Sequence, residues 1–135
     1  MEFLFIVALF FCNLLMVGVS LITQFVTYPS FKLIHKKEFS KFHKAYTKKM
    51  LFIVGPIMTI EFFITVTLFF VNTNFHFFIQ FVLVSIIWIL TFFLIVPIHK
   101  KLENQFHNKL NNNLIKLNGF RTSLWIIKLF FLSII

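Results

Sequence analysis

Long stretches of apolar side chains with almost no charge limit the folds that this chain can adopt. Residues 3–28 and 77–98 carry no charged side chain, and residues 50–71 carry one, Glu61. A fourth stretch, residues 116–135, is apolar apart from three cations. A helix needs about 20 mainly apolar residues to cross the hydrocarbon core of a bilayer. The sequence therefore predicts four transmembrane helices at these positions.

Composition excludes the main alternatives to a membrane protein. Of the 135 residues, 59% are hydrophobic and 13% are charged, whereas an ordinary soluble domain carries about 25% charged residues. A disordered chain needs low hydrophobicity, and one cysteine, Cys12, cannot form an internal disulfide framework. We expect a single all-α domain over residues 1–135, a polytopic four-helix transmembrane bundle.

The basic residues gather in two connections and predict the topology. The net charge is +9, with seven lysines from Lys32 to Lys49 and five basic residues from Lys100 to Arg121. Both clusters lie between apolar stretches, as cytoplasmic loops do, so we do not expect nucleic-acid binding. The connection at residues 72–74 carries no charge. The positive-inside rule then places both basic connections in the cytoplasm and both termini outside, and we expect a multi-pass protein of the inner (cytoplasmic) membrane.

Helical periodicity in both basic connections predicts two amphipathic helices on the cytoplasmic face, over residues 31–49 and 99–115. Each would place an apolar face in the headgroup region and its lysines toward anionic lipid. The apolar faces consist of Phe31, Ile34, Phe39, Phe42, Ala45 and Tyr46 in the first helix, and of Leu102, Phe106, Leu110 and Leu114 in the second.

The two halves of the chain resemble each other. Segments 23–29 and 91–97 each place a threonine six residues before a proline, at the predicted cytoplasmic end of a span. A Phe-His pair follows in each half, at residues 42–43 and 106–107. We therefore expect two tandem hairpin units in the same orientation, which is a parallel repeat.

The acid in the middle of the second stretch is the sharpest functional candidate. Glu61 lies about 16 Å into that span at 1.5 Å per residue, where a charge costs at least about 2.5 kcal/mol. It should face the bundle interior, either as a proton relay, ligand anchor or metal ligand, or as a structural bond between helices. Lys128 either pairs with Glu61 or snorkels outward. Trp88 lies in mid-span and needs an acceptor for its indole N–H, which Glu61 can supply.

Histidine spacing gives no metal signature. No His-x-x-x-His or Glu-x-x-His pair lies on a predicted span, and the sequence has no zinc motif, phosphate loop or nucleophile elbow. We therefore assign no residue as a metal ligand. A metal or haem site built from His43, His99 and Glu61 is kept as an alternative.

Several short motifs follow one another in an order that resembles a known family. They are Tyr28-Pro29-x-Phe31, Phe42-His43, Gly55-Pro56 with Glu61, Trp88-x-x-Thr91, Val96-Pro97-x-His99-x-x-Leu102 and Asn118-x-x-Arg121-Thr122-x-x-Trp125. Over nearly its whole length the chain resembles a family of small, largely uncharacterised bacterial four-helix membrane proteins, near the anthrone-oxygenase-like group. The resemblance implies functional positions in the cytoplasmic half of the bundle, at His43, Glu61, Trp88, His99, Arg121 and Trp125. By analogy it also implies oxidation of a hydrophobic aromatic substrate.

Two hypotheses of different classes follow. The first is an intramembrane site that binds or acts on a hydrophobic small molecule or redox cofactor, with no particular cofactor indicated. Its reacting groups would be Glu61, His43 and His99, and its binding groups would be Trp88, Arg121, Trp125 and Lys128. The alternative is a non-catalytic accessory subunit of a larger membrane complex. A proton-coupled transporter is a third hypothesis, which requires a homo-oligomer because four helices leave little room.

Overall fold

The computed structural model describes residues 1–135 as four long helices without strands. The first long helix consists of α1 (Glu2–Ile22), η1 (Thr23–Thr27), α2 (Tyr28–Ser30) and η2 (Phe31–Leu33); the second is α3 (Lys36–Val71); the third consists of α4 (Phe75–Ile89), η3 (Leu90–Ile95) and α5 (Val96–Asn104); and the fourth is α6 (Asn108–Ser133). Three of them are long and apolar enough to cross a membrane, namely Glu2–Leu33, Lys36–Val71 and Phe75–Asn104. This confirms the predicted all-helical class and is consistent with a membrane protein.

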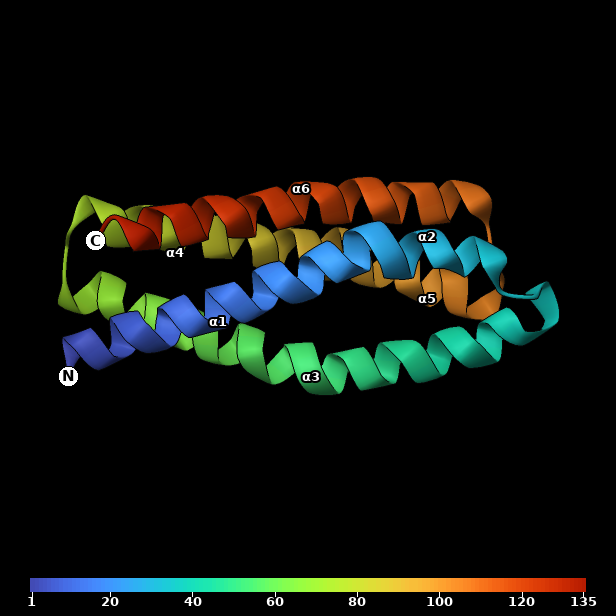
Figure 1. The fold of residues 1–135 in the computed structure, drawn as a ribbon, viewed down its shortest axis with the longest axis horizontal. Helices are drawn as coiled ribbons and strands as arrows, with labels where there is room; N and C mark the ends of the chain where they lie inside the picture. The colour runs from blue at the N-terminus through green and yellow to red at the C-terminus, as the bar shows by residue number, and fades with distance from the viewer.

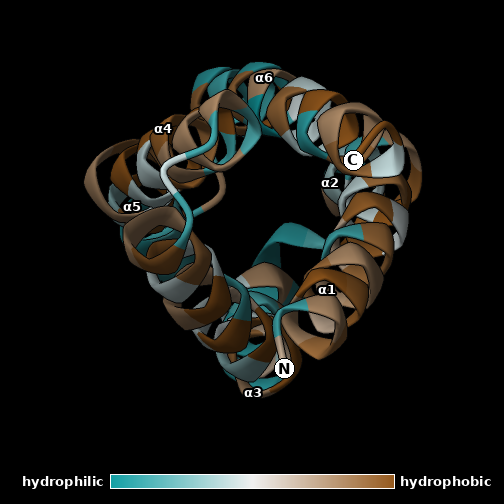
Figure 2. Ribbon diagram, turned by 90° about the vertical axis from the view of Figure 1, so that its left-hand side faces the viewer, coloured by the Kyte–Doolittle hydropathy of each residue, from teal (hydrophilic) through white to brown (hydrophobic).

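The four long helices form a ring. Helix α1 contacts α3 and α6, and helix α4 contacts the same two neighbours. The chain runs up and down the bundle, so that both termini lie at one end and both lysine-rich connections lie at the other (Figure 1). We call these the termini end and the basic end. The view along the bundle shows the helices surrounding a common axis (Figure 2).

Two π-helical segments mark equivalent places in the first and third long helices. Segment η1 comes just before Pro29 and segment η3 just before Pro97. Proline lacks a backbone N–H, and its ring clashes with a carbonyl of the preceding turn; a π turn is a local change of helix pitch that relieves this conflict. Thr23 and Thr91 each donate their hydroxyl to a carbonyl oxygen four residues earlier, both at 2.7 Å. The repeated Thr-to-Pro spacing therefore has the same local structure in both halves.

The structure differs from the sequence prediction at the two amphipathic segments. Residues 31–49 do not form a separate helix, because η2 ends at Leu33 and α3 then runs without a break from Lys36 to Val71. Residues 99–115 are divided by the connection at residues 105–107, with one part ending α5 and the other beginning α6. The apolar faces of these segments pack mainly on one another inside the bundle. Periodicity indicates that a face is buried, and it does not indicate which surface buries it.

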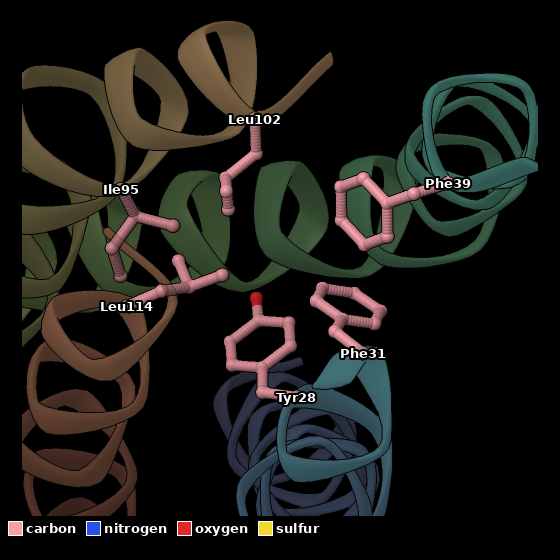
Figure 3. Packing of buried hydrophobic residues seen from close by; sticks show 6 residues of the cluster. All are labelled: Tyr28, Phe31, Phe39, Ile95, Leu102 and Leu114. Atoms are coloured by element: carbon pink, nitrogen blue, oxygen red, sulfur yellow. The ribbon is translucent and has the colours of Figure 1, made fainter. Parts of the chain in front are cut away.

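Three apolar clusters alternate with polar layers along the bundle. The basic-end cluster contains Tyr28, Phe31, Phe39, Ile95, Leu102 and Leu114, which come from all four long helices and point toward one another (Figure 3). The middle cluster contains Met16, Met58, Ile87, Leu124 and Trp125. The termini-end cluster contains Leu9, Leu68, Phe77 and Leu132. Along each helix, the buried polar residues fall mainly between these clusters.

The distribution of polar and apolar side chains is the reverse of that in a soluble domain. Twelve of the 28 buried residues are polar or charged. Large apolar side chains are exposed along the outside of every long helix, including Phe25, Phe52, Phe93 and Phe130. A contiguous apolar exterior of this kind belongs to a protein that is solvated by lipid.

A hydroxyl pair ties the first long helix to the fourth and provides a test of the packing. Thr122 donates its hydroxyl to the Asn118 carbonyl at 2.7 Å, so Ser20 must be the donor in the 2.5 Å contact between the Ser20 and Thr122 hydroxyls. We predict that a double-mutant cycle of Ser20→Ala and Thr122→Val gives a coupling free energy of about 0.6 kcal/mol, with an upper bound of about 2 kcal/mol. The measurement is the free energy of unfolding in detergent or bicelles.

The control cycle pairs Ser20→Ala with Thr67→Val. The exposed Thr67 hydroxyl bonds only to the Phe63 carbonyl of its own helix, so its coupling to Ser20 should be zero. Equal coupling in the two cycles would show that the Ser20–Thr122 contact does not join the helices.

Candidate functional site

The mid-span acid lies inside the bundle and is paired. Glu61 and Lys128 are both 0% exposed, and the Lys128 ammonium donates to Glu61 Oε1 in the only ion pair of the chain. Of the two alternatives for Lys128, the structure shows the pairing with Glu61. The second carboxylate oxygen, Oε2, accepts the indole N–H of Trp125 at 3.3 Å. Both oxygens of Glu61 therefore have partners within the protein.

All four long helices contribute to the polar layer around this pair. Between the middle and termini-end clusters each of them buries one polar side chain completely; we call these residues, Asn13, Glu61, Gln80 and Lys128, the acid layer. Gln80 donates to the Lys128 carbonyl at 2.8 Å and so joins α4 to α6. A fully buried ion pair that is held by further hydrogen bonds fixes the register of the helices that carry it.

A second cation lies in the next layer toward the basic end. Arg121 is 9% exposed and donates to the Asn118 side-chain oxygen at 2.8 Å and to the Thr91 hydroxyl at 3.2 Å. Its guanidinium carbon also lies 5.2 Å from the centre of the Trp125 ring system, which is a cation–π distance. These partners are neutral, and no carboxylate pairs with Arg121.

Trp125 joins the two layers and makes the hydrogen bond to Glu61 that the sequence predicts for Trp88. The predicted hydrogen bond from Trp88 to Glu61 is wrong: Trp125 makes that bond, and the indole nitrogen of Trp88 has no partner. Trp88 instead packs between Phe62 and Phe92, with ring centroids 4.9 and 5.1 Å away. Both tryptophans lie within long helices, Trp88 in α4 and Trp125 in α6, and hydropathy does not indicate which of them rotates toward the acid.

Two histidines and a tyrosine form a hydrogen-bonded chain at the basic end. His43 Nε2 lies 3.0 Å from His99 Nδ1, and His99 Nε2 lies 3.0 Å from the Tyr28 hydroxyl. A neutral imidazole has one N–H and one bare nitrogen, so donation runs in a single direction along the three side chains. Such a chain is able to move a proton between its ends. Both histidines are site residues predicted from the sequence. Tyr28 is not predicted as their partner, although it belongs to the Tyr-Pro motif.

One large cavity lies between α3 and the third long helix. Its volume is about 560 Å³, within the range of about 300–1,000 Å³ that is typical of small-molecule sites. Helix α3 buries no side chain between His43 and Met58, which leaves this part of the ring open. Side chains of α1, α2 and α6 form the wall opposite the opening.

The cavity collects some of the predicted site residues and leaves others out. Trp88, His99, Arg121 and Trp125 line it, together with apolar groups such as Met16, Val54 and Met58. Glu61, His43 and Lys128 do not line it; Glu61 is linked to it through Trp125, and His43 through His99. The Gly55-Pro56 pair within α3 is the one sequence signal for this opening, since a proline in a span can open a local pocket or serve only as a packing kink, and Gly55 lines the cavity.

The structure brings no metal-ligand set together. No group of three or more His, Cys, Asp or Glu side chains is placed to hold a metal ion. His43 and Glu61 are 18 residues apart on one unbroken helix, which separates them by roughly 27 Å. The three-residue site built from His43, His99 and Glu61 is therefore excluded by geometry.

The acid layer gives a test of how much the ion pair contributes to stability. We predict that Lys128→Met destabilises the fold by about 3–5 kcal/mol, because it leaves Glu61 buried without a counter-charge. The double variant Glu61→Gln/Lys128→Met should recover most of this loss, because a neutral amide still accepts the Trp125 N–H. The measurement is the free energy of unfolding, with Lys116→Met, at an exposed lysine on the same helix, as the control. A double variant no more stable than Lys128→Met would contradict the pairing.

Comparisons with protein-family models, with curated proteins and with solved structures match this chain to none of them. The resemblance to the anthrone-oxygenase-like group therefore stays a prediction.

Proposed function

We propose that this chain is a multi-pass protein of a bacterial inner membrane in which all four long helices span the bilayer. The apolar part of the fourth helix, α6, contains cations, whereas the apolar stretches of the other three contain none. Two of these, Arg121 and Lys128, are buried in the bundle and do not face lipid. The outward side of α6 near these two cations carries Phe120, Ile126 and Ile127, which are exposed. An α6 that turns its cations inward is compatible with hydrocarbon on its outer face.

The lysine-rich connections then lie at the cytoplasmic face. Lys36, Lys37, Lys41, Lys44 and Lys48 are all exposed, and each is available to anionic headgroups at about 1 kcal/mol per residue. The uncharged connection at residues 72–74 lies at the opposite end, beside both termini. This arrangement satisfies the positive-inside rule.

The function that the geometry supports best is the binding of a hydrophobic small molecule within the membrane. The observation that carries this proposal is the cavity of about 560 Å³, whose walls are largely apolar and which opens sideways between α3 and the third long helix. Leu51 and Phe92 line it and are 71% and 51% exposed, so the opening faces the hydrocarbon region. A ligand dissolved in lipid reaches the cavity without crossing water.

Glu61 has a structural role in this proposal. Its oxygens are engaged by Lys128 and Trp125, and it does not line the cavity. We therefore place Glu61 as the group that positions Trp125, and we place the ligand contacts at Trp88, His99, Arg121 and Trp125. The accessory-subunit alternative has no specific observation in its favour, because lipid accounts for the exposed apolar side chains.

The proposed topology predicts which side of the membrane each connection faces. In a Cys12→Ala background, Thr73→Cys should react with a membrane-impermeant maleimide on intact cells or spheroplasts. Lys37→Cys should react only after permeabilisation, because it lies in the basic end. Both positions are exposed, so accessibility within the fold does not bias the comparison. The reverse pattern would overturn the topology.

The cavity predicts a position-specific loss of ligand. A long-chain probe that carries a diazirine should label Met16 and Met58, which line the cavity and are only 1% and 6% exposed. We expect Val54→Trp to reduce this labelling strongly, because the indole projects into the cavity and occupies space that the chain of the probe needs. Ile53→Trp is the matched control, since Ile53 is the neighbouring residue and is exposed outside the cavity. Adducts mapped by mass spectrometry decide the outcome.

The probe is supplied in two forms, a long-chain fatty acid and the matching long-chain alcohol. Labelling of Met16 and Met58 by either form, strongly reduced in Val54→Trp and kept in Ile53→Trp, supports the proposed function. Labelling by neither form, with exposed residues such as Phe11 still modified by both, would overturn it.

A further inference from the structure

We infer that the ligand of the cavity is a single-chain amphiphile with a carboxylate head that pairs with Arg121. This inference rests on the proposed function and adds the chemical class of the ligand. Its first support is that Arg121 has no negatively charged partner within the protein. The chain has one ion pair, which joins Lys128 to Glu61. Arg121 is buried among Thr91, Asn118 and Trp125, which are neutral.

A buried guanidinium without an anion is costly. Arginine stays protonated in proteins, so Arg121 cannot lower the cost by losing its proton. Buried charges are stable when they are paired and fully hydrogen-bonded. Arg121 lines the cavity, and an anion placed there supplies the counter-charge that the chain lacks.

The charges around the cavity favour the same kind of ligand. Four cations line it, Lys44, Lys48, Lys100 and Arg121, against one acid, Glu103. Glu103 already accepts the Thr47 hydroxyl at 3.2 Å. A cavity lined in this proportion concentrates anions and rejects cations.

Tyr28 offers a second donor to the head group. His43 Nδ1 is buried and has no hydrogen-bond partner, and a bare nitrogen is less costly there than an N–H without an acceptor. His43 therefore carries its proton on Nε2 and donates to His99, which in turn donates from Nε2 to the Tyr28 oxygen. The Tyr28 O–H is then free to donate, and Tyr28 lines the cavity.

The shape of the lining indicates an amphiphile with one chain. Most charged lining residues lie toward the basic end, together with Tyr28, Tyr46 and His99. Arg121 lies between them and the middle cluster, and Met16, Met58 and Trp88 line the part beside that cluster. A head group at the basic end and a chain toward the middle cluster match this division. A cavity of about 560 Å³ has room for one long acyl chain and not for a two-chain phospholipid.

The experiment compares the fatty acid and the alcohol forms of the diazirine probe on the full-length protein in bilayers. The two forms differ only in the charge of the head group. We expect the acid to label Met16 and Met58 about tenfold more efficiently than the alcohol, a factor that corresponds to about 1.4 kcal/mol. Arg121→Gln should reduce the acid to the level of the alcohol, and Arg121→Lys should keep part of the preference because it keeps the charge.

Lys116→Gln is the matched control, because it removes one exposed cation from the same helix outside the cavity and should leave the preference unchanged. Equal labelling by acid and alcohol in the unmodified protein would overturn this inference and leave the proposed function standing. Loss of the preference in Lys116→Gln as well would assign it to general surface charge and would also overturn it. If Arg121→Gln does not fold, the comparison of the two probes on the unmodified protein and on Arg121→Lys decides the matter.

Discussion

The low polarity of the surrounding hydrocarbon determines how this bundle is organised. Lipid offers no hydrogen-bond partners, so polar side chains within the spans must find partners inside the protein. Glu61, Lys128 and Arg121 accordingly face the common axis, while phenylalanine and isoleucine side chains cover the outside. The alternation of apolar clusters and polar layers follows from this constraint, because polar side chains that face the axis take the place of apolar side chains at certain heights along the bundle.

The two polar layers are completed in different ways, and this difference produces the cavity. In the acid layer all four long helices contribute a buried side chain, and the charge of Lys128 is balanced by Glu61. At the level of Arg121, helix α3 buries nothing between His43 and Met58. The ring is therefore incomplete at the level where the protein leaves a charge unbalanced. The buried ion pair and the cavity are therefore separated along the bundle axis.

Features of the fold that depend on a large free-energy cost are predictable from the sequence, and features that depend on packing are not. Uncharged stretches determined the helices, because the cost of charge in hydrocarbon outweighs local propensity, and the same cost placed Glu61 inside with Lys128 as a partner. Rotation and spacing of helices depend on packing, which hydropathy does not encode. For this reason Trp125 takes the place predicted for Trp88, and the amphipathic segments continue the long helices. The opening beside α3 had one local signal, the Gly55-Pro56 pair within that helix. Tyr28 was missed because a buried tyrosine in an apolar segment resembles ordinary core.

Trp125 gives the acid layer an influence on the cavity that Glu61 does not have directly. One side chain donates its N–H to Glu61 Oε2 and offers its ring to Arg121. Indole has two rotatable side-chain bonds, and both of its contacts must hold for the ring to keep its orientation. A change at Glu61 therefore reaches the wall of the cavity through the position of one aromatic ring, which lines that cavity. The buried acid of α3 is linked to the cavity one layer away only through this ring.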